Sequence, residues 1–296
     1  MTLNHALLAL IAAGAVIGMA LPAAAQDLYT GGAPTAEALG WRVGTQAYSF
    51  NRFSFYEAVD KTAAIGLKYI EAYPGQRLSQ DKPEDVKFDH NMAPELQQEV
   101  LAYLAAKNVK LVNYGVVDIS RDEDKARVVF EFAKAMGIET IVSEPGKPAL
   151  PVAAKLADEY GINVAIHNHP KPSMYWDYNK VLEAVEGLSP RVGSCADTGH
   201  WPRSGVNPLE AVKALAEAKR IISFHFKDLN EFGNREAHDV IWGTGVCNVK
   251  DIMAELKSQN VKGVFSIEYE HNWENSLPEI SRCVENFEKF AQELSK

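Results

Sequence analysis

Cysteine and positive charge are both scarce in this sequence, and each deficit excludes a class of protein. The 296 residues contain 3 cysteines, Cys195, Cys247 and Cys283, which cannot all pair and whose spacing fits neither a disulfide scaffold nor a zinc knuckle. Lys and Arg total 30 against 39 Asp and Glu, so the formal net charge is −9, and no basic run is present. Such a chain is poorly suited to bind nucleic acid.

Charged residues are also missing from the N-terminus. Residues 1–25 contain no Lys, Arg, Asp or Glu, and residues 6–21 form an apolar run that is short for a membrane span. The small residues Ala23 and Ala25 precede Gln26, as at a signal-peptidase site. We predict a signal peptide over 1–25, an N-terminal extension over 26–40, and a periplasmic or secreted protein that is free of the membrane after cleavage. An uncleaved membrane anchor is the alternative.

Beyond residue 40 no linker, low-complexity tract or charge block divides the chain. A short apolar run, a polar or glycine-containing loop and an amphipathic segment recur, and Gly66, Gly137 and Gly161 stand where helices should end. Eight such units, at about 34 residues each, predict a single parallel (β/α)8 TIM barrel over 41–296. A doubly wound open sheet is the alternative, but TQAYSFNRF lacks its Gly-rich turn. The predicted strands are 43–50, 67–73, 110–117, 140–144, 163–167, 193–197, 222–227 and 264–268.

Ionisable side chains end four successive predicted strands, namely His167, Asp197, His225 and Glu268. A small residue precedes each of them by two positions, and these are Ala165, Cys195, Ser223 and Ser266. Because strand side chains alternate, both members of each pair face the barrel axis, near the end where barrel active sites lie. Buried charges must be paired or bind metal, so we predict a site for Mn²⁺, Zn²⁺, Co²⁺ or Mg²⁺. Glu144, which ends the fourth strand, is a candidate further ligand.

The segments DTGH, HFKD and SIEYE on the last three strands resemble the xylose-isomerase-like TIM barrels, which include sugar phosphate isomerases and epimerases and endonuclease IV. The resemblance covers residues 41–294. It implies a metal ion held by Glu, Asp, His and Glu from strands 5 to 8, and Asp197, His225 and Glu268 match the last three. His167, in AIHNHP, stands where the family has its first Glu. Either His167 or Glu144 would complete the metal shell, and His167 would otherwise be the catalytic base.

Several further residues around the barrel mouth are candidates for catalysis or substrate binding. Lys227 lies two residues after His225 and could polarise a substrate carbonyl or orient Glu268, which is itself a candidate proton acceptor. The resemblance implies that His200 occupies a family position that binds substrate oxygen or a second metal. His238 precedes a Gly-x-Gly loop, much like the loop that provides a zinc ligand in endonuclease IV. The expected substrate contacts are His169, His200, Trp201, Arg203, His238, Trp242 and Trp273.

These residues favour a metal-dependent sugar isomerase or epimerase that acts through an enediolate, with the metal bound to two vicinal oxygens. Export favours an unphosphorylated carbohydrate substrate, and a keto-glycoside lyase or hydrolase is the alternative within the class. A non-catalytic carbohydrate-binding barrel is a further alternative. An endonuclease IV-like phosphodiesterase needs extra histidines on strands 2 and 3, and IEAYPG and NYGVVD contain none.

Overall fold

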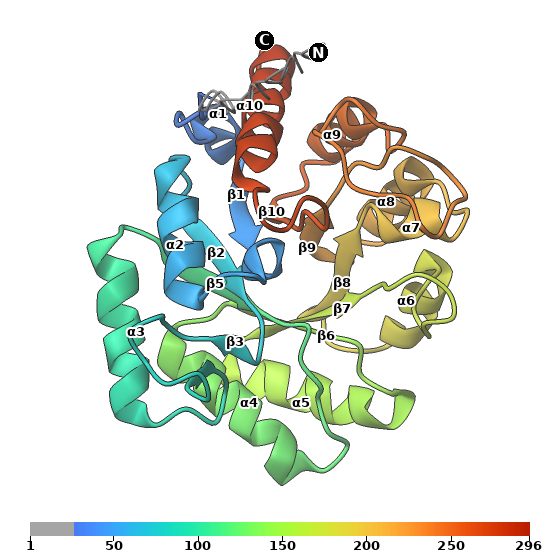
Figure 1. The fold of residues 1–296 in the computed structure, drawn as a ribbon. Coiled ribbons are helices and arrows are strands. Elements are labelled where there is room, and N and C mark those ends of the chain that lie inside the picture. The colour runs from blue at the N-terminus through green and yellow to red at the C-terminus, as the bar shows by residue number, and fades with distance from the viewer. Residues whose placement is uncertain (1–26) are drawn as a thin grey trace, which may run out of the picture.

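A computed structural model describes residues 27–296, so the predicted signal peptide lies outside the described residues. The chain forms a closed parallel barrel in which the strands follow the order β1-β10-β9-β8-β7-β6-β5-β2 (Figure 1). This arrangement confirms the predicted TIM barrel. The barrel strands are β1 (Trp41–Gln46), β2 (Tyr69–Ala72), β5 (Lys110–Tyr114), β6 (Thr140–Ser143), β7 (Asn163–His167), β8 (Val192–Asp197), β9 (Ile221–Phe226) and β10 (Gly263–Ile267).

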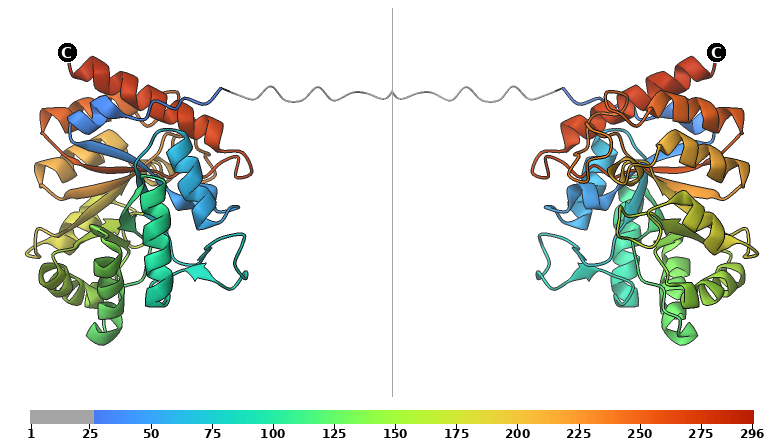
Figure 2. Two further views of the ribbon diagram at one scale, coloured as in Figure 1. Left: turned by 90° about the vertical axis from the view of Figure 1, so that its left-hand side faces the viewer. Right: turned by 90° about the vertical axis from the view of Figure 1, so that its right-hand side faces the viewer.

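Helices surround the barrel, and a small antiparallel hairpin of β3 (Gln76–Arg77) and β4 (Lys87–Phe88) projects from its side (Figure 2). Within residues 27–296 no helix has the length and apolar character needed to cross a membrane. The helices are α1 (Pro34–Ala38), η1 (Ala47–Phe50), α2 (Phe55–Ala64), α3 (Pro94–Ala106), α4 (Glu123–Met136), η2 (Lys147–Ala149), α5 (Leu150–Tyr160), α6 (Tyr178–Val185), α7 (His200–Arg203), α8 (Pro208–Glu217), α9 (Val249–Ser258) and α10 (Leu277–Leu294).

The predicted first strand, 43–50, is wrong in its second half. β1 ends at Gln46, and the next four residues form the short helix η1. The Gln46 side chain accepts a hydrogen bond from the Tyr48 backbone N–H and so caps this helix. Ala47 and Phe50 are buried in the hydrophobic core, so the apolar character of this segment reflects core packing rather than strand pairing.

The glycines that were expected to end helices do so. Gly137 and Gly161 follow α4 and α5 with φ of 70° and 68°, in the left-handed region that glycine adopts most readily. Gly66, after α2, has φ of 77°. These caps turn the chain from each helix back into the next strand.

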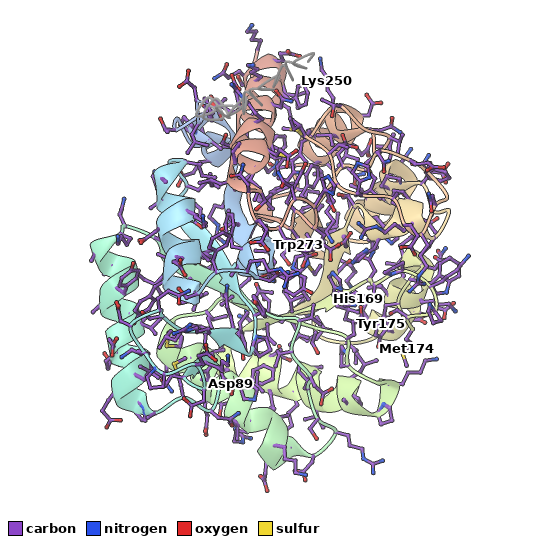
Figure 3. The ribbon with its side chains drawn as sticks, viewed as in Figure 1. Asp89, His169, Met174, Tyr175, Lys250 and Trp273 are labelled. Atoms are coloured by element: carbon purple, nitrogen blue, oxygen red, sulfur yellow. The ribbon has the colours of Figure 1, made fainter. Side chains whose placement is uncertain are left out.

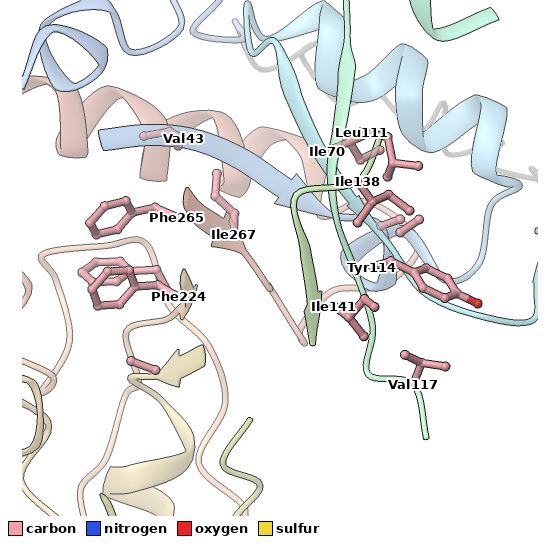
Figure 4. Packing of buried hydrophobic residues seen from close by; sticks show 14 of the residues in the cluster. Val43, Ile70, Leu111, Tyr114, Val117, Ile138, Ile141, Phe224, Phe265 and Ile267 are labelled. Atoms are coloured by element: carbon pink, nitrogen blue, oxygen red, sulfur yellow. The ribbon is translucent and has the colours of Figure 1, made fainter. Parts of the chain in front are cut away.

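Side chains of different size occupy the two faces of the barrel wall. Toward the axis, Val142, Ala165 and Cys195 form a small separate cluster, as the period-two pattern predicts. Toward the helices, Phe265 of β10 stacks on Phe224 with ring centroids 4.3 Å apart (Figure 4). The main hydrophobic core thus lies between the strands and the helices, and small interior residues leave room for polar groups above them.

Replacing Phe265 with Ala should destabilise the fold by about 3–5 kcal/mol, because Phe265 is fully buried and the truncation opens a cavity between β10 and α10. Urea unfolding followed by far-UV circular dichroism measures this free energy. Phe232→Ala is the matched control, since that ring is 48% exposed and its loss should change stability by about 0.5 kcal/mol or less. Equal losses in the two variants would contradict the assignment of the core.

Candidate functional site

The carboxyl ends of the strands enclose a cavity of about 280 Å³. Histidine and glutamate side chains line the part next to β7, β8 and β10, whereas tyrosine, glutamine and apolar residues line the part next to β1, β2 and β5. Among the former are His169, His200, Glu268 and Glu270. This is the end of the barrel at which the strand-end residues were predicted to gather.

His167 is held between two carboxylates from neighbouring strands. Its Nδ1 lies 3.2 Å from Glu144 Oε1, and its Nε2 lies 3.4 Å from Asp197 Oδ2. Carboxylates only accept hydrogen bonds, and both ring nitrogens face one, so without a metal the two carboxylates favour the doubly protonated ring. A metal ion that displaces the Nε2 proton would leave the Nδ1 proton directed at Glu144. Burial alone would lower the pKa of His167, but its bonds to Asp197 and Glu144 outweigh burial and raise it.

His225 on β9 repeats this arrangement, with its ring centroid 4.7 Å from that of His167. Its Nε2 lies 2.7 Å from Glu71 Oε1, and its Nδ1 lies 3.2 Å from Glu268 Oε2. Both ring nitrogens again face carboxylate oxygens, and the shorter of the two hydrogen bonds is the one from Nε2 to Glu71. Two histidines are therefore each oriented by one carboxylate and aimed at another.

Glu71 is a site residue that the sequence reasoning missed. It belongs to β2, is fully buried, and its Oε2 accepts hydrogen bonds from Ser266 Oγ at 2.6 Å and from Asn113 Nδ2 at 3.2 Å. A signal was present, because a Glu between apolar residues in a predicted strand needs a buried partner.

Lys227 supplies the positive charge at the centre of the site. Its buried ammonium Nζ lies 2.6 Å from Glu268 Oε2, 2.7 Å from Glu270 Oε2 and 3.1 Å from Asp197 Oδ2. Burial by itself would lower the pKa of Lys227, but attraction to Asp197, Glu268 and Glu270 outweighs burial and raises the pKa well above its ordinary value. Lys227 is therefore a permanent cation, shared by three carboxylates.

His200 is fixed as a neutral hydrogen-bond donor. Arg203 Nη1, which can only donate, lies 3.0 Å from His200 Nδ1, so the ring proton is on Nε2. Burial lowers the pKa of His200 well below its ordinary value, which keeps the ring uncharged. His200 Nε2 lies 3.5 Å from Asp197 Oδ2 and borders the cavity.

The donor atoms suit a metal ion. One group of buried side chains, His167, Asp197, His200 and Glu268, places its donors within 4.8 Å of one another, and His225 adjoins it through Glu268. Within residues 27–296, His167 Nε2 is buried without a hydrogen-bond partner and faces Asp197 Oδ2, which also lies 3.1 Å from the Lys227 ammonium. A metal ion between His167 Nε2 and Asp197 Oδ2 would therefore share Asp197 with Lys227. Glu144, His167 and His169 form a second group.

The structure corrects the predicted role of two tryptophans. Trp201 and Trp242 are 0% and 1% exposed and belong to the hydrophobic core, where Trp242 packs against Phe226 and Phe287. Neither indole lines the cavity, because both rings are buried in the hydrophobic core, Trp201 from α7 and Trp242 from the segment between β9 and α9. Their role is packing.

The other residues predicted to contact the substrate differ in whether they line the cavity and in whether protein groups already bind them. His169 borders the cavity, where its Nδ1 lies 2.6 Å from Glu144 Oε1. His238 stacks on His271 with centroids 4.4 Å apart. Arg203 is engaged by Glu270 at 2.8 Å and by Asp239 at 3.3 Å. The guanidinium of Arg203 therefore has carboxylate partners within the protein.

Asp239 is a buried carboxyl next to Arg203 and Glu270. Its Oδ2 accepts hydrogen bonds from Arg203 Nη2 and from the Glu270 backbone N–H, and its Oδ1 has no partner within residues 27–296. Burial raises the pKa of Asp239 to about 7, with Glu270 and Asp197 adding to the shift while Lys227 and Arg203 oppose it. It is the carboxyl in this cluster that should titrate near neutral pH.

The fold and the strand-end cluster together define a TIM barrel with a polar site at the carboxyl ends of its strands. The sequence profile described as xylose isomerase-like TIM barrel matches residues 59–287. The chain therefore belongs to the xylose isomerase-like TIM barrel family. No curated protein matches the chain.

Three solved structures illustrate the likeness. A protein from Parabacteroides distasonis ATCC 8503 described as uncharacterised is 31% identical, with a TM-score of 0.67 over 84% of this chain and 98% of its own. D-allulose 3-epimerase from Methylomonas sp. is 16% identical, with a TM-score of 0.63 over 84% and 98%. The IolI protein with a bound zinc atom is 15% identical, with a TM-score of 0.60 over 86% and 96%. The latter two show the shared fold alone.

The raised pKa of Asp239 predicts how stability depends on pH. The carboxyl binds its proton more tightly in the folded chain than in the unfolded chain, where its pKa is about 3.9. Its contribution should be complete below about pH 4 and should be lost as the pH rises through about 7. Urea unfolding in EDTA at pH 5 and pH 8 should therefore show a larger fall in stability for the wild type than for Asp239→Asn. Asp85→Asn, at an exposed position, is the control, and parallel pH profiles for wild type and Asp239→Asn would contradict the prediction.

Proposed function

We propose that this protein is an exported, divalent-metal-dependent enzyme that isomerises or epimerises a small sugar. The supporting observation is the pair of oriented histidines, each aimed by one carboxylate at a second one. His167, Asp197, His225 and Glu268 would hold the ion, which when bound polarises a sugar carbonyl and acidifies the neighbouring C–H. A sugar epimerase and a zinc-binding protein that share this fold support the same chemistry.

The orientation of the histidines bears on which residue completes the metal shell. Glu144 contacts His167 Nδ1, which leaves Nε2 free to face Asp197. Carboxylates commonly orient metal-binding histidines in this way and raise their basicity. His167 is therefore proposed as the ligand and Glu144 as the residue that positions it, and Glu71 has the same relation to His225.

The remaining polar groups would handle the substrate. His200 can donate a hydrogen bond from Nε2 to a sugar oxygen, because its ring is neutral and borders the cavity. Glu268 also borders the cavity, so its carboxylate is placed to accept a proton from carbon. Lys227 holds Glu268 in position at 2.6 Å and keeps it ionised.

Proton exchange in D₂O tests the reaction. With Mn²⁺ present, wild-type protein should introduce deuterium beside the carbonyl of an unphosphorylated ketohexose or keto-glycoside, as proton NMR would show. EDTA treatment, which removes the metal, and Asp197→Ala, which removes one of its ligands, should each reduce this exchange at least about 100-fold. Exchange that persists in metal-free protein, or its absence with every keto-sugar, would refute the proposal.

The roles proposed for Glu144 and Glu71 predict metal affinity directly. Glu144→Gln and Glu71→Gln should each weaken Mn²⁺ binding about 10–100-fold in isothermal titration calorimetry, because the histidine they orient loses its carboxylate partner. Glu183→Gln, at an exposed position on α6, should leave the affinity unchanged. If Glu144 were itself a ligand and His167 the base, His167→Ala would retain the metal and lose exchange.

Export remains the proposal for localisation. N-terminal sequencing of the protein recovered from the periplasm or the medium should find Gln26 as the first residue, because signal peptidase cleaves after small residues such as Ala25. Intact Met1 on protein confined to the cytoplasm would contradict it.

A further inference from the structure

Uncharged aromatic groups form the part of the cavity that the proposed chemistry does not use. Tyr48 in η1 and Tyr73 after β2 both border the cavity, and Trp273 lies in the loop after β10. The strands that lead into these loops are consecutive in the barrel order β10-β1-β2. Figure 3 shows Trp273 over the same end of the barrel as His169.

These three residues, Tyr48, Tyr73 and Trp273, which we term the aromatic platform, pack edge to face. The Tyr48 ring centroid lies 5.2 Å from that of Tyr73 and 5.7 Å from that of Trp273, with interplanar angles of 81° and 82°. Tyr48 is 38% exposed, and Tyr73 and Trp273 are partly exposed. Within residues 27–296, neither of the two phenol oxygens donates or accepts a hydrogen bond. Exposed aromatic faces beside a cavity are typical of a binding surface.

The two buried cations of the site are already paired with carboxylates, and the exposed Arg52, four residues after Tyr48, lies 3.6 Å from Glu274. Lys227 contacts three carboxylates, and Arg203 contacts Glu270, Asp239 and the Ala237 backbone carbonyl. Neither Lys nor Arg is among the residues that line the cavity, whereas two glutamates are. A phosphate group beside the platform would therefore meet aromatic rings and carboxylates, with no lysine or arginine lining the cavity to pair with it.

We infer that the aromatic platform binds a second, uncharged ring of the substrate, so that the enzyme acts on unphosphorylated keto-glycosides in preference to sugar phosphates or single sugars. This inference rests on the proposed function, because it takes the reacting sugar to bind beside His200 and Glu268. The apolar faces of a sugar ring or an aromatic aglycone would stack on Tyr48 and Trp273. The platform then determines substrate specificity without taking part in proton transfer.

Equilibrium binding to a set of stable probes tests the inference. Isothermal titration calorimetry would compare p-nitrophenyl β-D-glucoside and cellobiose with methyl β-D-glucoside and glucose 6-phosphate, all with Mn²⁺-loaded protein. The two-ring probes should bind at least about tenfold more tightly than the methyl glucoside, and glucose 6-phosphate should bind no better than the latter. Tighter binding of glucose 6-phosphate, or no measurable binding of the two-ring probes, would overturn the inference.

Variants of the platform locate the effect. Tyr48→Ala and Trp273→Ala should each weaken binding of the two-ring probes about tenfold and change binding of the methyl glucoside less than about twofold. Tyr48→Leu, which keeps the bulk of the side chain but not its ring face, should behave like Tyr48→Ala and so guards against a folding defect. Tyr56→Ala is the matched control. The Tyr56 ring stacks on Tyr103 with centroids 3.9 Å apart, and neither residue lines the cavity.

The two proposals can fail separately. If the two-ring probes bind as expected but no keto-glycoside exchanges deuterium, the proposed reaction is wrong and the platform stands. If exchange occurs equally well with single sugars and with glycosides, and Tyr48→Ala and Trp273→Ala do not alter KM for either, the platform is wrong and the reaction stands.

Discussion

The buried ammonium of Lys227 is the interaction on which the site depends. Three carboxylates, from Asp197, Glu268 and Glu270, lie within 3.1 Å of one nitrogen. Without this cation their mutual repulsion and desolvation would be prohibitive, because a buried charge is tolerated only when it is paired. Arg203 likewise forms ion pairs with Glu270 and with Asp239, at the edge of this cluster.

The division of side chains between the two faces of the barrel makes space for this ion cluster. Phe224 and Phe265 fill the layer between strands and helices, while Ala165 and Cys195 face the axis. Bulky residues at the axial positions would occupy the volume that the imidazoles of His167 and His225 use. The polar site is thus a consequence of small residues below it as well as of ionisable residues in it.

Each of the two histidines depends on a carboxylate from another part of the chain. Glu144 is 23 positions from His167, whereas Glu71 is 154 positions from His225. Barrel closure joins the first and last strands and brings Glu71 to His225. When one ring nitrogen donates a hydrogen bond to a carboxylate, the other nitrogen is the one that can bind a metal ion. The fold thus determines which nitrogen of each histidine would be the metal ligand.

The sequence by itself determined the barrel and the level of the site, because strand–helix alternation is local and because strand ends of a parallel barrel meet at one edge. His167, Asp197, His225 and Glu268 could be selected on that ground alone. Only the tertiary structure decided their partners. Trp201 and Trp273 look alike in sequence, yet one is core and the other lies in a loop over the cavity, since loop conformation has no simple periodicity. For Glu71 the reason is different: a Glu between apolar strand residues signals a buried partner, but the partner, His225, lies on a distant strand that local sequence patterns do not identify.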